Sequence, residues 1–130
     1  MYSHDYDSSY AHGPALPVVE LYVRPVAATA GGVGLHALVD SGADATILPL
    51  MALHDAQVEQ VGRAILRWGS HRSQSYNVYL ATVTIGPYAI RGVRILAEPD
   101  SGGEAILGRD VLNQLVVTLN GLANVVEISQ

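Results

Sequence analysis

Short apolar runs, separated by glycine, proline and polar turns, occupy this chain from residue 18 to residue 128. In the run 18–24 the residues Val19, Leu21 and Val23 alternate with their neighbours, which is the two-residue period of a half-buried β-strand. Runs of this kind predict an all-β fold with one or two short helices. The expected strands span 18–24, 35–39, 47–50, 64–68, 76–85, 90–97, 105–107, 116–119 and 125–128, and the expected helices lie within 51–61 and 109–115.

The composition excludes several classes of protein. Hydrophobic residues make up 49% of the 130 positions, which suits one domain with its own core and not a disordered chain. Cysteine is absent, so neither a disulfide framework nor a thiolate metal site can form. The net charge of -5 and the scattered arginines argue against binding to nucleic acid, which needs a clustered basic face. No apolar run approaches the roughly 20 residues of a membrane span.

The N-terminal segment differs from the rest of the chain. Residues 1–14 are polar and rich in Tyr, Ser, His and Asp, and they lack a signal-peptide pattern. We therefore expect a flexible tail over 1–14, a single domain over 15–130, a cytoplasmic location and no membrane partner.

The segment from Leu38 to Thr46 carries the strongest chemical signal. An apolar strand there delivers the carboxylate of Asp40 to a tight turn, where Gly42 permits backbone geometry that a side chain would hinder. The Gly42 N–H and the Ser41 hydroxyl can hold that carboxylate. Taken alone, Asp-Ser-Gly is also an ordinary turn sequence.

The same tripeptide recurs at residues 100–102 and acts as an internal comparison. It follows Glu98 and Pro99 instead of an apolar strand, so we expect an ordinary surface loop. Asp100 also follows Asp40 too closely for the chain to hold two complete lobes, each built around one of them.

A second segment, 105–112, places Ile106, Leu107 and Gly108 directly before a short helix that starts near Arg109. Alone it is an ordinary strand-to-helix connection. Together the two segments resemble the retroviral-type aspartic proteases (retropepsins) and are most similar to single-domain cellular and bacterial relatives. That family has an apolar-apolar-Asp-Thr/Ser-Gly-Ala segment followed, late in the chain, by Ile/Leu-Leu/Ile-Gly-Arg and a helix. The resemblance covers residues 18–128.

The resemblance implies a single-lobe acid-protease fold, a two-fold homodimer and an aspartic-type endopeptidase. It makes Asp40 the catalytic carboxylate, lets Ser41 bond across the subunit interface, and lets Gly42 present its backbone to substrate. Asp44 would lie beside the cleft, next to Ala43, and pair with Arg109. Structural support for the Asp40 loop would come from Ile106, Leu107, Gly108 and Arg109.

The hairpin tip from Trp68 to Ser75 falls where the family has its flap, which closes over an extended peptide. This tip departs from the glycine-rich viral pattern, since Gly69 is its one glycine. Trp68 either covers a substrate pocket or joins the core. Ala45 replaces an acidic residue that is common in viral members. The tip residues expected to contact substrate are Trp68, Gly69, Ser70 and His71.

The C-terminal segments flank Asn120-Gly121, which is a strong hairpin signal. By resemblance this hairpin either supplies a dimer sheet or simply closes the core.

The implied chemistry needs two copies of the Asp40 loop. Two carboxylates a few ångströms apart share one proton, because both cannot ionise cheaply. The ionised one then deprotonates water while the protonated one polarises the peptide carbonyl, as in the aspartic proteases generally. The chain offers one such loop, so the expected partners are a second copy of itself and a peptide or protein substrate bound as an added strand.

Other short motifs are weaker. Residues 32–37 fit a loose dinucleotide fingerprint, but Asp-Ser-Gly follows where that fingerprint needs a helix. The histidines show no ligand-like spacing, so neither a metal nor another cofactor is expected. Ser41 is not in a Gly-x-Ser-x-Gly elbow, which argues against a serine hydrolase. The alternative that stays open is a dimeric peptide-binding module of the same fold with weak or no proteolysis.

Overall fold

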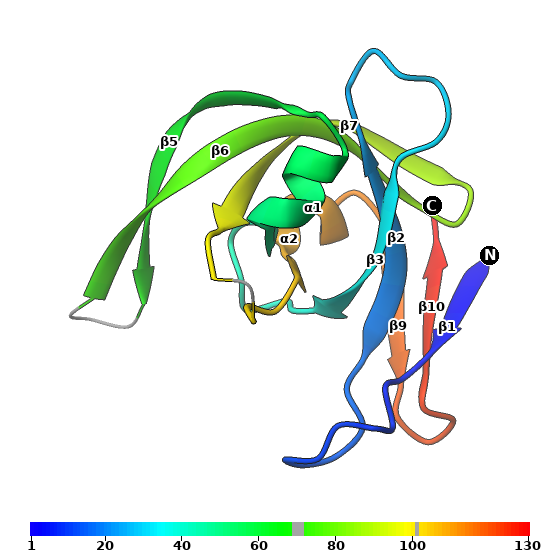
Figure 1. The fold of residues 1–130 in the computed structure, drawn as a ribbon. Helices are drawn as coiled ribbons and strands as arrows, with labels where there is room; N and C mark the ends of the chain where they lie inside the picture. The colour runs from blue at the N-terminus through cyan, green and yellow to red at the C-terminus, as the bar shows by residue number, and fades with distance from the viewer. Residues whose placement is uncertain (69–71, 101) are drawn as a thin grey trace.

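A computed structural model describes residues 1–68, 72–100 and 102–130, and the chain in it is mostly β with two short helices (Figure 1). The predicted all-β class is therefore confirmed. The strands are β1 Tyr2–Asp5, β2 Val18–Arg24, β3 Val33–Val39, β4 Ile47–Pro49, β5 Glu59–Trp68, β6 Arg72–Ile85, β7 Tyr88–Glu98, β8 Ile106–Leu107, β9 Val116–Asn120 and β10 Val125–Ser129, and the helices are α1 Leu50–Asp55 and α2 Arg109–Leu112.

Seven of the strands form one sheet in the order β2-β3-β8-β4-β7-β6-β5. The short strand β8 is parallel to β3, with Leu38 opposite Ile106, and antiparallel to β4. Since β3 and β4 are consecutive in the chain, β8 separates two strands that a simple hairpin would have paired. The connection from residue 40 to residue 46 must therefore pass the end of β8, which brings the two sequence motifs together.

The inward-facing residues of this sheet form the main part of the core. Val19, Leu21 and Val23 of β2 have no exposed surface, as their alternation predicts. Burying a side chain of this size fully contributes about 1.5–3 kcal/mol relative to leaving it exposed. A second, smaller apolar cluster is centred on Ile47, Tyr76, Val78 and Leu96, with Leu66, Ala45, Ala64 and Ile106 packed against it at partial exposure.

The prediction of a flexible tail over residues 1–14 is wrong for its first part. Tyr2–Asp5 forms β1, which pairs antiparallel with β10 in a three-stranded sheet of order β1-β10-β9. The Tyr2 ring packs against the core, and its hydroxyl accepts a hydrogen bond from the Glu20 N–H at 3.3 Å. Burial raises the pKa of the Tyr2 hydroxyl above its ordinary value. Strand β10 pairs with β9 on one side and with β1 on the other. Hydrogen bonds to β10 therefore satisfy the backbone of residues 2–5 and keep this segment ordered.

The short helix predicted within 51–61 is confirmed as α1, which begins one residue earlier, at Leu50, and ends at Asp55. Gln57 then adopts a left-handed conformation (φ 57°), and Glu59 already begins β5. The hairpin tip predicted from Trp68 to Ser75 is shorter, because β5 and β6 stay paired out to Trp68 opposite Arg72. This hairpin reaches out from the body of the molecule (Figure 1). Residues 69–71 lie outside the described part of the chain.

None of the helices in the described ranges is long and apolar enough to cross a membrane.

Candidate functional site

Asp40 lies directly after β3, half-buried, between a buried strand and an exposed turn. Its backbone N–H donates to the Leu107 carbonyl at 3.1 Å, which fixes the end of β3 against β8. The Gly42 N–H donates to the Asp40 carboxylate at 2.9 Å. This contact from the side chain to the backbone two residues on closes a tight turn, which holds the acid in one orientation.

The second Asp-Ser-Gly lacks this arrangement. Asp100 is exposed, and its backbone N–H donates to the Glu98 carboxylate at 3.1 Å. Among the described residues no backbone N–H binds the Asp100 carboxylate itself, in contrast to Asp40. Ser101 lies outside the described residues.

Arg109 ties the Asp40 loop to the start of α2. Its guanidinium donates to the Asp44 carboxylate, as the sequence predicts, and to the Ser41 carbonyl at 2.7 Å. Its backbone N–H donates to the Ala43 carbonyl at 2.9 Å. The paired side chains of Arg109 and Asp44 are 39% and 76% exposed, so the ion pair itself adds little stability. Its main effect is geometric, because one side chain fixes both Ser41 and Asp44.

A polar network centred on the buried Thr46, which the sequence did not reveal, lies beneath the loop. The Thr46 hydroxyl donates to the Asp110 carboxylate at 2.7 Å and accepts from the Gly108 N–H at 3.1 Å. The Thr46 N–H donates to the other carboxylate oxygen of Asp110 at 3.1 Å. Thr46 has no exposed surface, so its hydroxyl and its N–H depend on Asp110 and Gly108 for their hydrogen bonds.

The supporting residues of the second motif lie beside this network. Leu107 is fully buried in the main core, and Ile106 is half-buried in the smaller apolar cluster. Gly108 packs so closely on the backbone of Ala45 that a methyl group there would lie 2.5 Å from the Ala45 carbonyl carbon. Only glycine therefore permits β8 and α2 to meet the loop in this way.

Replacing Thr46 by Val should lower the free energy of unfolding by about 2 kcal/mol. The change keeps the shape but leaves the Gly108 N–H without its acceptor and removes one donor from Asp110. Chemical denaturation followed by circular dichroism measures this loss. Thr46→Ser keeps the hydroxyl and is the matched control, so equal stability of the Val and Ser variants would contradict the role given to the network.

The structure describes some of the remaining expected site residues and leaves others outside its described ranges. Ala43 is half-buried and Asp44 exposed on the same loop as Asp40, so the structure brings Asp40, Ser41, Gly42, Ala43 and Asp44 together with Arg109. Trp68 ends β5, while Gly69, Ser70 and His71 lie outside the described residues. The substrate contacts expected of them stay predictions.

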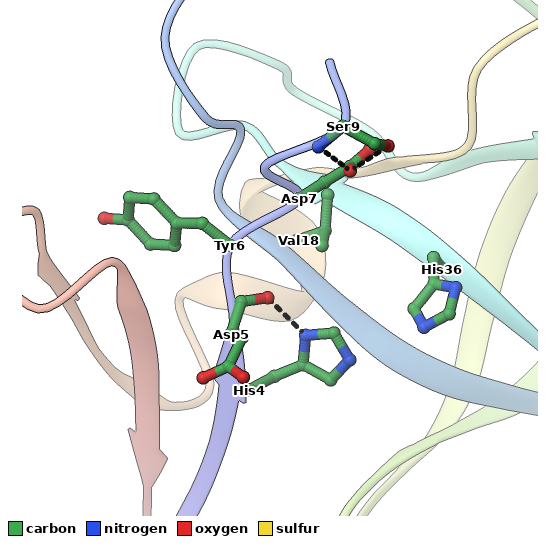
Figure 2. A pocket seen from close by; sticks show the side chains of 7 residues that line it. All are labelled: His4, Asp5, Tyr6, Asp7, Ser9, Val18 and His36. Carbon is green, nitrogen blue, oxygen red and sulfur yellow. Dashed lines mark hydrogen bonds between the residues drawn. The ribbon is translucent and has the colours of Figure 1, made fainter.

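A hollow of about 380 Å³ lies between β1 and the outer face of β2 and β3 (Figure 2). In it His4 and His36 face each other with ring centroids 5.2 Å apart, and His36 Nε2 lies 3.9 Å from the Glu20 carboxylate. Spacing along the chain could not reveal this pair, because the two histidines come from strands in different sheets. Across the described ranges, no cluster of three or more His, Asp or Glu side chains could hold a metal ion.

Comparison with known proteins agrees with this geometry. No curated protein sequence matches the chain. A family model described as gag-polyprotein putative aspartyl protease matches residues 26–114, which include both the Asp40 loop and the segment from Ile106 to Arg109. This match spans more than half of the chain and both of the segments that build the site. The chain therefore belongs to the retropepsin-like aspartyl protease family.

Proposed function

We propose that this protein is an aspartic endopeptidase that acts as a two-fold homodimer, with Asp40 of each subunit activating one water molecule. The observation that carries the proposal is the fixed, half-buried carboxylate of Asp40, which the Gly42 N–H holds at the open end of β3. A binding module would gain nothing from an acid held in this way, whereas peptide hydrolysis depends on it.

The reaction needs an acid and a base in the same place. Two Asp40 carboxylates facing each other would share one proton, because two adjacent negative charges repel strongly. The ionised carboxylate removes a proton from water, which attacks the peptide carbonyl carbon, while the protonated carboxylate donates a hydrogen bond to the carbonyl oxygen. The C–N bond of the tetrahedral intermediate then breaks as the carboxyl group that took the water proton passes it to the amide nitrogen, so an acid and an amine leave and the pair keeps its one shared proton.

The second carboxylate is proposed to come from a second chain, because the other acids near the loop are engaged. Asp44 is paired with Arg109, and Asp110 accepts two hydrogen bonds from Thr46. Neither can turn toward Asp40 without breaking contacts that hold the loop. A two-fold axis beside Asp40 supplies an identical carboxylate without any such loss.

The β5–β6 hairpin supports a peptide as the substrate. It projects beyond the body of the molecule, and the smaller apolar cluster links its strands to β4 and β8 next to the Asp40 loop. Leu66 and Ile106 are partly exposed members of this cluster. An extended peptide between the hairpin and the loop would place apolar side chains against them, while its backbone makes strand-like hydrogen bonds.

A subunit-mixing experiment tests both parts of the proposal. A fixed amount of wild type is unfolded and refolded together with increasing amounts of Asp40→Asn, and cleavage of a peptide library is followed by mass spectrometry. With about a ninefold excess of the variant, cleavage should fall to about a tenth, because random pairing leaves only that share of wild-type subunits with a wild-type partner.

Two results would sink the proposal. Activity that does not change with added variant would mean that one chain suffices for catalysis. A wild type that binds peptides from the library but cleaves none of them would instead indicate a peptide-binding module.

A further inference from the structure

The charged residues of this chain are divided unevenly between its parts. Residues 60–97, which span most of β5, all of β6 and most of β7, hold five of the seven arginines and none of the twelve Asp and Glu residues. The rest of the chain carries every carboxylate side chain and two arginines. Soluble proteins usually intersperse both signs of charge on their surface, so a long segment with one sign needs a reason.

Three of these arginines lie on the β5–β6 hairpin, which projects from the body of the molecule (Figure 1). Arg63, Arg67 and Arg72 are all exposed, and each lies opposite a neutral residue in the register of the hairpin. Within the described part of the chain, none of the three forms a salt bridge. The hairpin is therefore a positively charged arm whose counter-charge comes from solvent or from a bound partner.

The register divides the three arginines between the two faces of the hairpin. Side chains alternate along a strand, and directly opposite residues share a face. Tyr76 belongs to the smaller apolar cluster, and Arg72 lies on the same face of β6, four residues nearer the tip of the hairpin. Arg67 lies on the other face, as does Arg63, which donates to the Ser75 hydroxyl at 3.1 Å. One arginine thus shares the face of the apolar cluster, and two lie behind it.

We propose that the substrates are acidic peptides, in which Asp or Glu side chains close to the cleaved bond are bound by Arg72. This inference rests on the proposed function, which places an extended peptide between the hairpin and the Asp40 loop. A guanidinium carries its N–H donors in a fork that matches the two oxygens of a carboxylate. Arg63 and Arg67 face away from that peptide and act at longer range, since their charge attracts an acidic chain during encounter.

The distribution of charge favours a peptide over a longer polyanion. A nucleic acid lying along the hairpin would extend over the rest of the molecule, which carries all twelve carboxylates and would repel it. A short peptide with one or two acidic residues meets only the hairpin and the apolar cluster. The chemistry that fits this surface is therefore a chain of mixed apolar and acidic side chains.

Matched peptides test the charge of the substrate. A peptide found in the library digest is made in two forms, with Glu or with Gln within about four positions of the cleaved bond, and kcat/KM is measured at low and at high sodium chloride concentration. The Glu form should be cleaved about tenfold better at low salt, mainly through a lower KM, because it gains a charge-assisted hydrogen bond. This preference should shrink to about twofold at high salt, because salt screens exposed charges.

Two arginine variants separate direct contact from long-range attraction. Arg72→Gln should lower the preference for the Glu form from about tenfold to about twofold. Arg67→Gln is the matched control, because it removes the same charge from the other face of the same hairpin. It should keep a preference of about fivefold or more, since only long-range attraction is lost. The ratio between the two peptide forms is taken on each variant, so a general loss of activity cancels.

The outcomes separate this inference from the proposal on which it rests. Equal cleavage of the two peptide forms, or equal losses of preference in the two variants, would overturn the role of Arg72 and leave the peptidase in place. If no peptide is cleaved, the peptidase proposal fails, and fluorescence anisotropy of the labelled peptides decides the inference. Tighter binding of the Glu form that depends on Arg72 would support it, whereas equal binding would overturn it. A single-stranded oligonucleotide that displaces the Glu form more effectively than unlabelled peptide would also overturn it, because the surface would then select polyanions.

Discussion

Replacing Asp40 by Asn should reduce kcat for peptide hydrolysis by at least about a thousandfold. The amide cannot take a proton from water, and it cannot share a proton with the same residue of a second subunit. The fold should survive, because the Asn carbonyl oxygen can still accept the Gly42 N–H that now holds the carboxylate at 2.9 Å. Cleavage of a fluorogenic peptide, chosen from the library digest, measures the loss.

The chain contains a matched control for this variant. Asp100→Asn makes the same chemical change in the same tripeptide, but in a loop where no described backbone N–H binds the carboxylate. It should keep most of the activity and the same thermal stability. Comparable losses in both variants, or a fully active Asp40→Asn, would contradict the catalytic role of Asp40.

Replacing Gly108 by Ala should destabilise the protein by about 3 kcal/mol or more, which is at the upper end for a single added methyl group. The new methyl carbon would lie 2.5 Å from both the carbonyl carbon and the oxygen of Ala45, and these backbone atoms cannot rotate away. Relief requires the loop and β8 to separate, which would also break the hydrogen bond from Gly108 to Thr46. Urea denaturation gives the free energy of unfolding.

Gly121→Ala is the control for Gly108→Ala. A methyl group at Gly121 would meet no atom within 4 Å, so this exposed turn should tolerate it with a change within about 0.5 kcal/mol. Similar stabilities for the two alanine variants would show that the contact between Gly108 and Ala45 is looser than the geometry indicates.

Most of what could be predicted came from two features of the sequence, the alternation of apolar residues in the strands and the two motifs around Asp40 and Gly108. Val19, Leu21 and Val23 are buried because a strand with one face on a core must alternate, which is a local rule. The pairing of Asp44 with Arg109 was predicted because a familiar motif fixes which residues approach each other. The substrate contacts expected of the hairpin tip are still predictions.

The features that could not be predicted depend on contacts between distant parts of the chain. The segment Tyr2–Asp5 reads as polar and becomes a strand only because β10 lies beside it. Asp110 looks like a solvated helix residue until β8 brings it to Thr46, which is 64 positions away in the chain. The β-bulge that shifts the register of β6 and β7 between Ala81 and Val83 likewise has a position that no local pattern marks.

The insertion of β8 between β3 and β4 has a consequence for the order of events during folding. The loop that carries Asp40 ends at residue 46, but the strand that anchors its backbone comes only at Leu107. Bringing Leu107 to Asp40 closes the long segment of chain between them. This costs conformational entropy before the contacts form, which slows folding. A growing chain therefore cannot anchor the backbone of the Asp40 loop until the ribosome has released the segment through α2, so the peptidase activity that we propose would begin only after most of the domain has been synthesised.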